Sequence, residues 1–331
     1  MSTRTTERLV YERGPRGDRD LERAAELLRA GRLVAFPTET VYGLGALALD
    51  PEAVRRIFAA KGRPPTNPLI VHVASVEQAR QVAAAWPEDA ERLAERFWPG
   101  PLTLVLPRAP VVPPEVTGGL EAVGIRLPAH PVARALIERV GAPLAAPSAN
   151  PYTGISPTSA EHVAKGLLGR IDAILDGGET TVGIESTVLD LSSARPRILR
   201  PGAVTAAEIE EVIGPVERLG AETDAALPSP GLARRHYAPR ARVVLLGPDE
   251  LAARAGRAGA RVGVMAIQPP PPQRGAGRWI AMPDDPRAYA RQLYRTLHAL
   301  EDEGVDELWI ELPPESEPWE GVRDRLRRAA G

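Results

Sequence analysis

Cysteine is absent from this chain of 331 residues, so it can form neither a disulfide nor a cysteine-ligated metal site. A thiolate nucleophile is excluded for the same reason. Histidine is also scarce, and the five imidazoles, at positions 72, 130, 162, 236 and 298, show no spacing typical of a zinc enzyme. The chain has no G-x-S-x-G elbow and no P-loop, which argues against a serine hydrolase and requires any nucleotide site to use another scheme.

Long apolar runs and an excess of one charge are missing as well. No apolar run approaches the roughly 20 residues of a membrane span, and the first 14 residues lack the apolar centre of a signal peptide. The formal net charge is −2, with a pI near 6.3. This balance gives no general polybasic field for DNA or a membrane surface. We therefore expect a soluble, cytoplasmic protein with no membrane and no DNA partner.

Lysine and asparagine are unusually rare. Lys61 and Lys165 are the only lysines, and Asn67 and Asn150 the only asparagines. An ammonium is a compact, strongly hydrated charge without the planar fork of arginine. Specific roles for Lys61, Asn67 and Asn150 would explain their retention; chance and a skewed coding preference are the alternative.

Three regions follow one another along the chain. Residues 1–214 alternate amphipathic helices with short apolar strands, and 215–240 has no sustained period and several Pro and Gly residues, as in a linker. Residues 241–331 alternate regularly, with strands at 242–246, 261–267 and 305–311 and helices at 248–257, 286–302 and 319–329. This pattern predicts a small parallel α/β domain.

The stretch 31–72 carries the strongest local signals. A buried strand is expected at 32–37, followed by hydroxyls and a carboxylate in Pro37–Thr40 and by a glycine-rich segment, 41–45, that lets backbone approach a bulky group. Asp50 caps a helix that begins at Pro51 and delivers Lys61 and Arg63 into the proline-broken loop 64–68. Two cations facing a Thr-rich strand end predict a site for a phosphate chain.

Further polar residues also lie largely at the ends of predicted strands. Singly, each has an ordinary explanation as a turn residue, a helix cap or a solvated edge charge. Together they predict a cleft for an anionic substrate. The set is Thr38, Glu39, Thr40, Lys61, Arg63, Asn67, His72, Arg126, Ser148, Asn150, Ser156, Glu185, Ser186, Thr187 and Arg200.

Six segments in a fixed order carry a family resemblance. They are FPTETVYGLG, KGRPPTNPLIVHV, WPGPLTLVL, GIRLPAHP, APSANPYTGISPT and ESTVLDL. In this order they resemble the threonylcarbamoyl-AMP synthase family, with its YrdC-like catalytic domain, over residues 20–213. The segments that begin at Ser229 (SPGL) and at His236 (HYAP), followed by a small domain, resemble the long two-domain form.

The resemblance implies a fold and domain organisation. We expect a YrdC-like twisted mixed α/β sheet with flanking helices and a concave cationic cleft in residues 1–214. Residues 215–240 would form a linker and lid over the active site. Residues 241–331 would form a small Rossmann-like parallel α/β domain.

The resemblance also implies an activity. Such a nucleotidyltransferase would convert L-threonine, bicarbonate and ATP into threonylcarbamoyl-AMP and pyrophosphate, for the threonylcarbamoyladenosine modification of tRNA. Its partners would be downstream tRNA threonylcarbamoyl-transferase proteins. Mg²⁺ would accompany ATP, held mainly by phosphates and water, so no protein metal site is expected.

Residue roles follow from the matching motifs. The catalytic basic pair would be Lys61 and Arg63. ATP would contact Lys61, Arg63, Asn67, Ser148, Asn150, Ser156 and Arg200. Threonine would contact Thr38, Thr40, His72, Arg126 and Ser186. As a separate hypothesis, Tyr237 reaches the nucleotide when the linker folds over the cleft.

Two other functions remain open at this point. The same concave basic surface could serve an RNA-binding or ribosome-associated module, although aromatic residues make up only 4% of the chain and are not interleaved with basic ones. Carbamoyl transfer through a carbamoyl-adenylate, as in hydrogenase-maturation proteins with a related domain, is the second. Those proteins carry zinc-binding and acylphosphatase-like regions, which this chain lacks.

Overall fold

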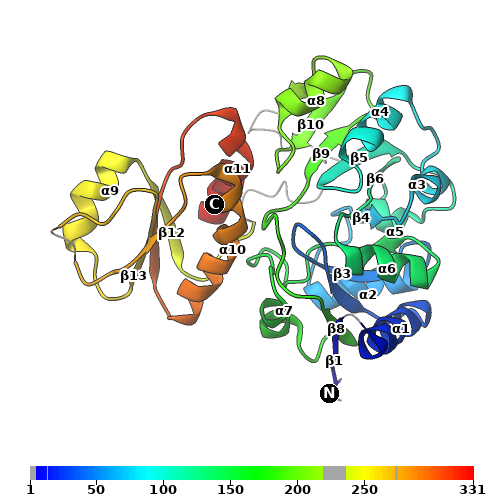
Figure 1. Ribbon diagram of the computed structural model, residues 1–331, viewed down its shortest axis with the longest axis horizontal. Coiled ribbons are helices and arrows are strands. Elements are labelled where there is room, and N and C mark those ends of the chain that lie inside the picture. The colour runs from blue at the N-terminus through cyan, green and yellow to red at the C-terminus, as the bar shows by residue number, and fades with distance from the viewer. Residues whose placement is uncertain (1–4, 13, 219–235, 273–274) are drawn as a thin grey trace.

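The computed structural model describes residues 5–12, 14–218, 236–272 and 275–331, and these form two sheets with flanking helices. An eleven-stranded sheet is built from Glu7 to Arg218, and a four-stranded sheet from Arg242 to Glu311. Figure 1 shows them side by side, with helices α10 and α11 of the second domain facing the first. In the described ranges, no helix has the length and apolar character needed to cross a membrane.

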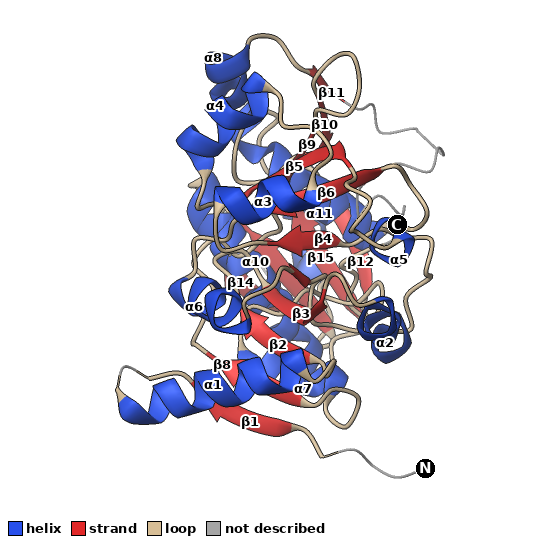
Figure 2. Ribbon diagram, turned by 90° about the vertical axis from the view of Figure 1, so that its right-hand side faces the viewer, coloured by secondary structure: helices blue, strands red, loops and turns tan. Residues whose placement is uncertain are grey.

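The large sheet is mixed, because parallel and antiparallel neighbours alternate irregularly across it. Figure 2 shows its strands stacked from β1 at one end to β11 at the other. In spatial order they are β1 (Glu7–Val10), β8 (Ala173–Asp176), β2 (Val34–Pro37), β3 (Tyr42–Leu47), β7 (Leu144–Ala145), β4 (Ile70–His72), β6 (Ala122–Arg126), β5 (Leu102–Pro107), β9 (Thr187–Asp190), β10 (Arg197–Arg200) and β11 (Glu217–Arg218).

Helices cover both faces of this sheet. On one face α1 and α6 pack over β2, where Val34 and Phe36 point toward them, and on the other Ala35 joins a core with α2, α3, α4, α7 and α8. Alternate residues of one strand thus enter opposite cores, as the pleat requires. The helices are α1 (Pro15–Arg29), α2 (Pro51–Lys61), α3 (Val76–Val82), α4 (Glu88–Phe97), α5 (Pro114–Thr117), α6 (Pro131–Val140), α7 (Ala160–Leu167) and α8 (Ala206–Ile213).

Helix α2 has the ends that its sequence predicts. The Asp50 carboxylate accepts from the backbone N–H groups of Glu52 and Ala53, at 2.9 and 3.3 Å, and Pro51 begins the helix. Gly62 ends it in the left-handed conformation, with φ of 65°. The chain therefore turns sharply between Lys61 and Arg63.

The C-terminal domain is a parallel α/β unit. Its strand order is β12 (Arg242–Leu246), β15 (Glu307–Glu311), β13 (Val262–Ala266) and β14 (Arg278–Ala281), all pairs being parallel. Its helices are α9 (Pro248–Arg254), α10 (Pro286–Asp302) and α11 (Glu320–Ala330), with short 3₁₀ turns η1 (Ala255–Arg257) and η2 (Glu317–Trp319). Val41, Ile155 and Ile184 of the first domain share a core with α10 and α11, so the two domains are packed together.

Three local expectations need correction or restriction. The glycine-rich segment 41–45 is mostly strand β3, and a Cβ on Gly45 would lie 2.7 Å from Cε1 of Phe36, so glycine is needed there for packing between strands. The sequence did not predict β1 or β14. Of the linker predicted at 215–240, residues 219–235, with the motif at Ser229, lie outside the described residues.

Candidate active site

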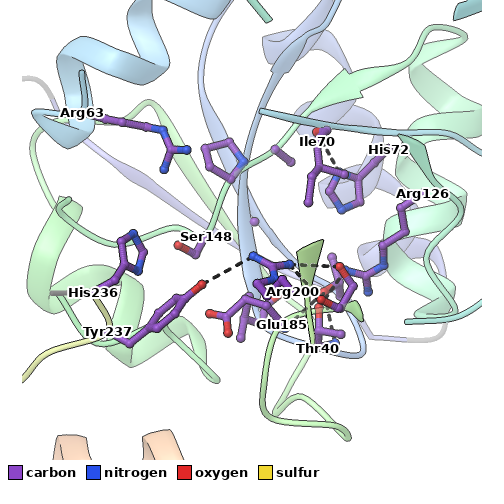
Figure 3. Close-up of a pocket in the computed structure, with 16 residues that line it drawn as sticks. Thr40, Arg63, Ile70, His72, Arg126, Ser148, Glu185, Arg200, His236 and Tyr237 are labelled. Atoms are coloured by element: carbon purple, nitrogen blue, oxygen red, sulfur yellow. Dashed lines mark hydrogen bonds between the residues drawn. The ribbon is translucent and has the colours of Figure 1, made fainter. Parts of the chain in front are cut away.

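A cavity lies where strand ends of the large sheet meet the segment of His236 and Tyr237, and the space between its lining residues, open solvent included, is ≈ 520 Å³. Figure 3 shows Arg63, Ser148, His236 and Tyr237 on one side of it, His72, Arg126 and Thr40 on the other, and Arg200 between them. The lining residues are Thr38, Thr40, Val41, Gly43, Arg63, Ile70, His72, Arg126, Ala146, Pro147, Ser148, Glu185, Ser186, Arg200, His236 and Tyr237.

Most of the predicted site residues are among these. The structure brings Thr38, Thr40, Arg63, His72, Arg126, Ser148, Ser186, Arg200 and Tyr237 to the cavity wall. It does not bring Lys61, Asn67, Asn150 or Ser156 there. Those four are not part of the cavity wall. Lys61, Asn67 and Ser156 each form a hydrogen bond with a lining residue, and Asn150 forms one with the carbonyl of Gly154 in the loop that follows Ser148.

One end of the cavity is built around Arg126. Its guanidinium donates to the Thr40 hydroxyl at 2.9 Å and lies 2.6 Å from the Glu39 carboxylate, while Thr38 and Thr40 hydroxyls are 2.9 Å apart. All these side chains are buried. Arg126 is thus a fixed cation whose fork suits a carboxylate.

His72 lies beside Arg126 as a neutral ring. Burial, helped by the neighbouring Arg126 charge, lowers the pKa of His72 to about 3. Its Nδ1 lies 3.3 Å from the carbonyl of Ile70. At neutral pH the ring is therefore a hydrogen-bonding group and carries no charge.

Arg200 joins the two ends of the cavity. It donates to the carbonyl of Ser186 at 2.9 and 3.1 Å and to its hydroxyl at 3.2 Å, and one Nη lies 3.5 Å from the Tyr237 hydroxyl. The Ser186 hydroxyl lies 2.8 Å from that of Thr103. Burial lowers the pKa of Arg200 and raises that of Tyr237, so the phenol stays neutral.

Arg63 provides the second cation on the Tyr237 side. Its Nη2 donates to Asn67 Oδ1 at 2.7 Å and to the carbonyl of Pro68 at 2.9 Å, and its guanidinium stacks 5.9 Å from the Tyr152 ring centre. Burial lowers the pKa of Arg63 to about 10, so it remains protonated. Asn67 therefore acts on the site through Arg63.

Lys61 is oriented differently from the sequence expectation of a phosphate contact. Its ammonium donates to the backbone carbonyls of Ser148 and Asn150 and is buried. Burial, together with the nearby charge of Arg63, lowers the pKa of Lys61 well below its usual value. In this conformation Lys61 fixes the loop that places Ser148 on the cavity wall.

Asn150 and Ser156 hold the same loop region together. Asn150 Nδ2 donates to the carbonyls of Pro151 and Gly154 at 3.0 and 2.8 Å. The Ser156 hydroxyl donates to the Glu185 carboxylate, 2.5 Å away. Asn150 Oδ1 is buried without a hydrogen-bond partner among the described residues.

Two residues of the wall were not assigned a role from the sequence. His236 is buried, with both ring nitrogens unbonded within the described part of the chain, and contacts the Tyr237 ring edge-on at 4.1 Å between centres. Its place beside Tyr237 in the motif at 236–239 was the available signal. Glu185 belonged to the polar set of the sequence, but two of its partners, Tyr294 and Arg325, come from the C-terminal domain, which only the fold reveals.

The arrangement suits an anionic substrate with several charges. Fixed guanidinium groups at Arg63, Arg126 and Arg200 face a cavity with hydroxyls and a neutral imidazole, and the surrounding burial strengthens their electrostatic effect. Among the described residues, no cluster of three or more acidic, Cys or His side chains could hold a metal ion.

Comparisons with known proteins cover nearly the whole chain. The family model described as "Telomere recombination" matches residues 26–202, and the one described as "Threonylcarbamoyl-AMP synthase, C-terminal domain" matches 204–331. Threonylcarbamoyl-AMP synthases of Pyrococcus abyssi and Bacillus subtilis are 48% and 43% identical, the matches covering 93% and 95% of this chain and 93% and 94% of theirs. A crystal structure of P. abyssi Sua5 complexed with L-threonine superposes with a TM-score of 0.90 at 44% identity, covering 98% of this chain and 97% of that one.

Proposed function

We propose that this chain, which belongs to the threonylcarbamoyl-AMP synthase family, condenses L-threonine, bicarbonate and ATP into threonylcarbamoyl-AMP with release of pyrophosphate. The observation that carries the proposal is the cavity itself, in which the guanidinium groups of Arg126 and Arg63 lie on opposite sides with Arg200 between them (Figure 3). Such a site can bind an amino-acid carboxylate at one end and a triphosphate at the other.

The reaction requires the protein mainly to position the substrates and to stabilise the charge that develops. The free threonine amine takes up CO₂ from bicarbonate, with loss of water, to give a carbamate. A carbamate oxygen then attacks the α-phosphorus of ATP as the bond to the pyrophosphate oxygen breaks. The reaction is therefore a nucleotidyl transfer. Charge grows on the phosphoryl oxygens and on pyrophosphate, where Arg63 and Arg200 would stabilise it. No covalent enzyme nucleophile is needed, because the carbamate itself attacks.

Threonine is assigned to the end of the cavity around Arg126. Arg126 would hold its carboxylate, and Thr38, Thr40, neutral His72 and Ser186 would contact its amine and hydroxyl. This assignment is supported by the burial of these groups in one wall and by the threonine complex of P. abyssi Sua5. Discrimination against serine would come from packing of the threonine methyl group.

ATP is assigned to the end that holds Arg63 and Tyr237. Ser148, Arg63 and Arg200 would contact it directly, with Lys61, Asn67, Asn150 and Ser156 holding those groups in place. Mg²⁺ would enter as part of the ATP substrate, coordinated by phosphates and water. The buried carboxylates near the cavity, Glu39 and Glu185, are paired with Arg126 and Arg325, which supports this reading.

The product would pass to proteins that transfer the threonylcarbamoyl group to tRNA adenosine, and the reaction would take place in the cytoplasm, where ATP and tRNA are available. The RNA-binding alternative is not favoured, since relatives named as synthases match nearly the full chain.

The test is pyrophosphate release from Mg-ATP, measured with and without L-threonine and bicarbonate, with the product identified by mass spectrometry. Release that needs all three substrates, and falls at least tenfold in Arg63→Gln, supports the proposal. Release without threonine, or release driven by carbamoyl phosphate, would assign the cavity to another acceptor or to carbamoyl transfer. RNA bound tightly at physiological salt, with no pyrophosphate released, would favour the binding module.

A further inference from the structure

Helix α11 contributes a side chain that contacts residues in and behind the cavity wall. Arg325, on α11, is the largest fully buried side chain among the described residues, and its side chain has no exposed area. It belongs to the C-terminal domain and pairs there with the Asp324 carboxylate at 2.6 Å, whereas its other hydrogen-bond partners, Glu185 and Pro201, belong to the first domain. A charged side chain is buried so fully only when it is paired and hydrogen-bonded.

The Arg325 guanidinium forms hydrogen bonds with two chain segments, one directly before a cavity residue and the other directly after one. Its Nε donates to the Glu185 carboxylate at 2.8 Å and its Nη2 to the Glu185 carbonyl at 3.2 Å, and Glu185 directly precedes Ser186. Its Nη1 donates to the carbonyl of Pro201 at 2.9 Å, and Pro201 directly follows Arg200. One side chain thus fixes the start of β9 and the end of β10.

The same helix also holds the segment with His236 and Tyr237. The backbone N–H of His236 donates to the carbonyl of Arg328 at 2.9 Å, and the Arg325 guanidinium lies 5.4 Å from the centre of the Tyr237 ring. From α10, the Tyr294 hydroxyl donates to Glu185 at 2.9 Å. Burial alone would raise the pKa of Glu185, but Arg325 and Arg200 outweigh it and keep that pKa below its usual value.

Close backbone packing brings α11 into contact with the loop after β10. A Cβ placed on Gly321 would lie 2.9 Å from the carbonyl oxygen of Gly202, and a Cβ on Gly202 would lie 2.4 Å from the backbone nitrogen of Thr187. Helix α11 therefore rests on the loop after β10, and that loop rests on the start of β9. Arg325 follows Gly321 by four residues, on the same side of the helix.

We propose that Arg325 is a positioning residue for the cavity, supplied by the C-terminal domain: through Glu185 and Pro201 it sets the places of Ser186 and Arg200, and it supports the ring of Tyr237. The C-terminal domain thereby becomes part of the catalytic unit. This inference rests on the proposed function, because its effect is measured on threonylcarbamoyl-AMP synthesis.

The experiment compares Arg325→Lys with Arg327→Lys in the full-length chain. Lysine keeps the positive charge beside Glu185, but a single ammonium cannot serve Glu185 Oε2, the Glu185 carbonyl and the Pro201 carbonyl together. We expect kcat/KM for both L-threonine and ATP to fall at least tenfold in Arg325→Lys. Arg327, exposed on the same helix, provides the matched control, and its variant should remain within twofold of the wild type.

A second pair of variants separates positioning from stability. Arg325→Met leaves Glu185 buried without its cation and should lower the melting temperature. The double variant Glu185→Gln/Arg325→Met removes both charges and should recover melting temperature without recovering kcat. Wild-type kinetics in Arg325→Lys, or recovery of kcat together with stability in the double variant, would overturn the inference. An inactive wild-type protein would instead count against the proposed function.

Discussion

His72 and Arg126 are direct partners in the parallel ladder of β4 and β6, so their side chains leave the sheet next to each other. This register places a neutral imidazole beside a fixed guanidinium at one end of the cavity. Their closeness in space comes from pairing between segments that are more than fifty positions apart in the sequence. It also explains why the Arg126 charge opposes protonation of His72.

Replacing Arg126 with lysine should weaken threonine binding selectively. The planar fork that reaches Thr40 and Glu39, and that would bind the substrate carboxylate, is lost, and a charge-assisted hydrogen bond contributes about 1.5–3 kcal/mol. We expect KM for L-threonine to rise roughly 10- to 100-fold, with the KM for ATP nearly unchanged. Steady-state kinetics with each substrate varied in turn measures this, with the exposed Arg139→Lys as control. Equal losses for both substrates would contradict the assignment of Arg126 to threonine.

The two lysines provide a matched comparison. Lys61→Met leaves the carbonyls of Ser148 and Asn150 without their donor, and a buried unsatisfied polar group costs about 1–3 kcal/mol. We expect a loss of unfolding free energy of about that size, together with a large rise in KM for ATP as the Ser148 loop shifts. Lys165→Arg, at an exposed ion pair with Asp302, should change neither by more than about 0.5 kcal/mol or twofold. Urea unfolding and ATP kinetics test both variants.

The alternative for Lys61 is a direct phosphate contact after a change of rotamer. In that case Lys61→Met should abolish pyrophosphate release while leaving the midpoint of urea unfolding unchanged. A stable, inactive variant would therefore favour direct contact, and a destabilised variant with raised KM would favour loop support.

Much of this architecture was predicted from local sequence patterns. Short stretches of sequence were enough to predict the caps of α2, the amphipathic face of α1 and the alternation of strands and helices after residue 241. The structure has these elements near the expected places. Strand β3 was missed because Gly43 and Gly45 have low strand propensity, and packing against Phe36 decides their conformation. The residue type of Lys61 indicates charge, but the direction of its side chain depends on the loop at 148–150, so the sequence did not predict its contacts with the carbonyls of Ser148 and Asn150.

The contacts between the two domains could not be predicted from the sequence, for a similar reason. Arg325 falls on the apolar stripe of α11, away from exposed Arg327, but Arg323 on the same helix is buried too, and the local pattern does not show which of these two reaches the site. Only the docking of α11 against Gly202 gives Arg325 its buried position. Long-range packing, which no short window contains, therefore decides which arginine belongs to the site.

Acid should loosen the domain interface through a pair of histidines. His162 and His298 stack with ring centres 3.8 Å apart, and burial is the main cause that lowers their pKa values to about 4 and about 3. Because these folded-state values lie below the ordinary value near 6.5, their contribution to stability is complete above about pH 6.5. It is lost as the pH falls from there toward 3.

The measurement is the melting temperature at pH 7.5 and pH 4.5. Acidification should lower it less in His162→Gln/His298→Gln than in the wild type, because the double variant has no imidazoles to protonate there. Lys165→Arg, on the same helix as His162, should keep the wild-type pH response. An unchanged pH response in the double variant would assign the acid sensitivity to other groups, such as buried carboxylates or His72 and His236.

Tyr237, in the described end of the linker, tests whether this segment closes the cavity. Its ring is buried in the wall, held between His236 and the Arg325 guanidinium, and its hydroxyl lies 3.5 Å from Arg200. Tyr237→Ala should remove this cover, admit water to the labile carbamate and mixed anhydride, and raise either the hydrolysis of threonylcarbamoyl-AMP or the KM for ATP several-fold. Tyr237→Phe keeps the ring and should have a smaller effect, which separates cover from the hydroxyl contact. Product decay followed by chromatography, together with ATP kinetics, decides the point: if Tyr237→Ala matches the wild type in both, Tyr237 only anchors the second domain.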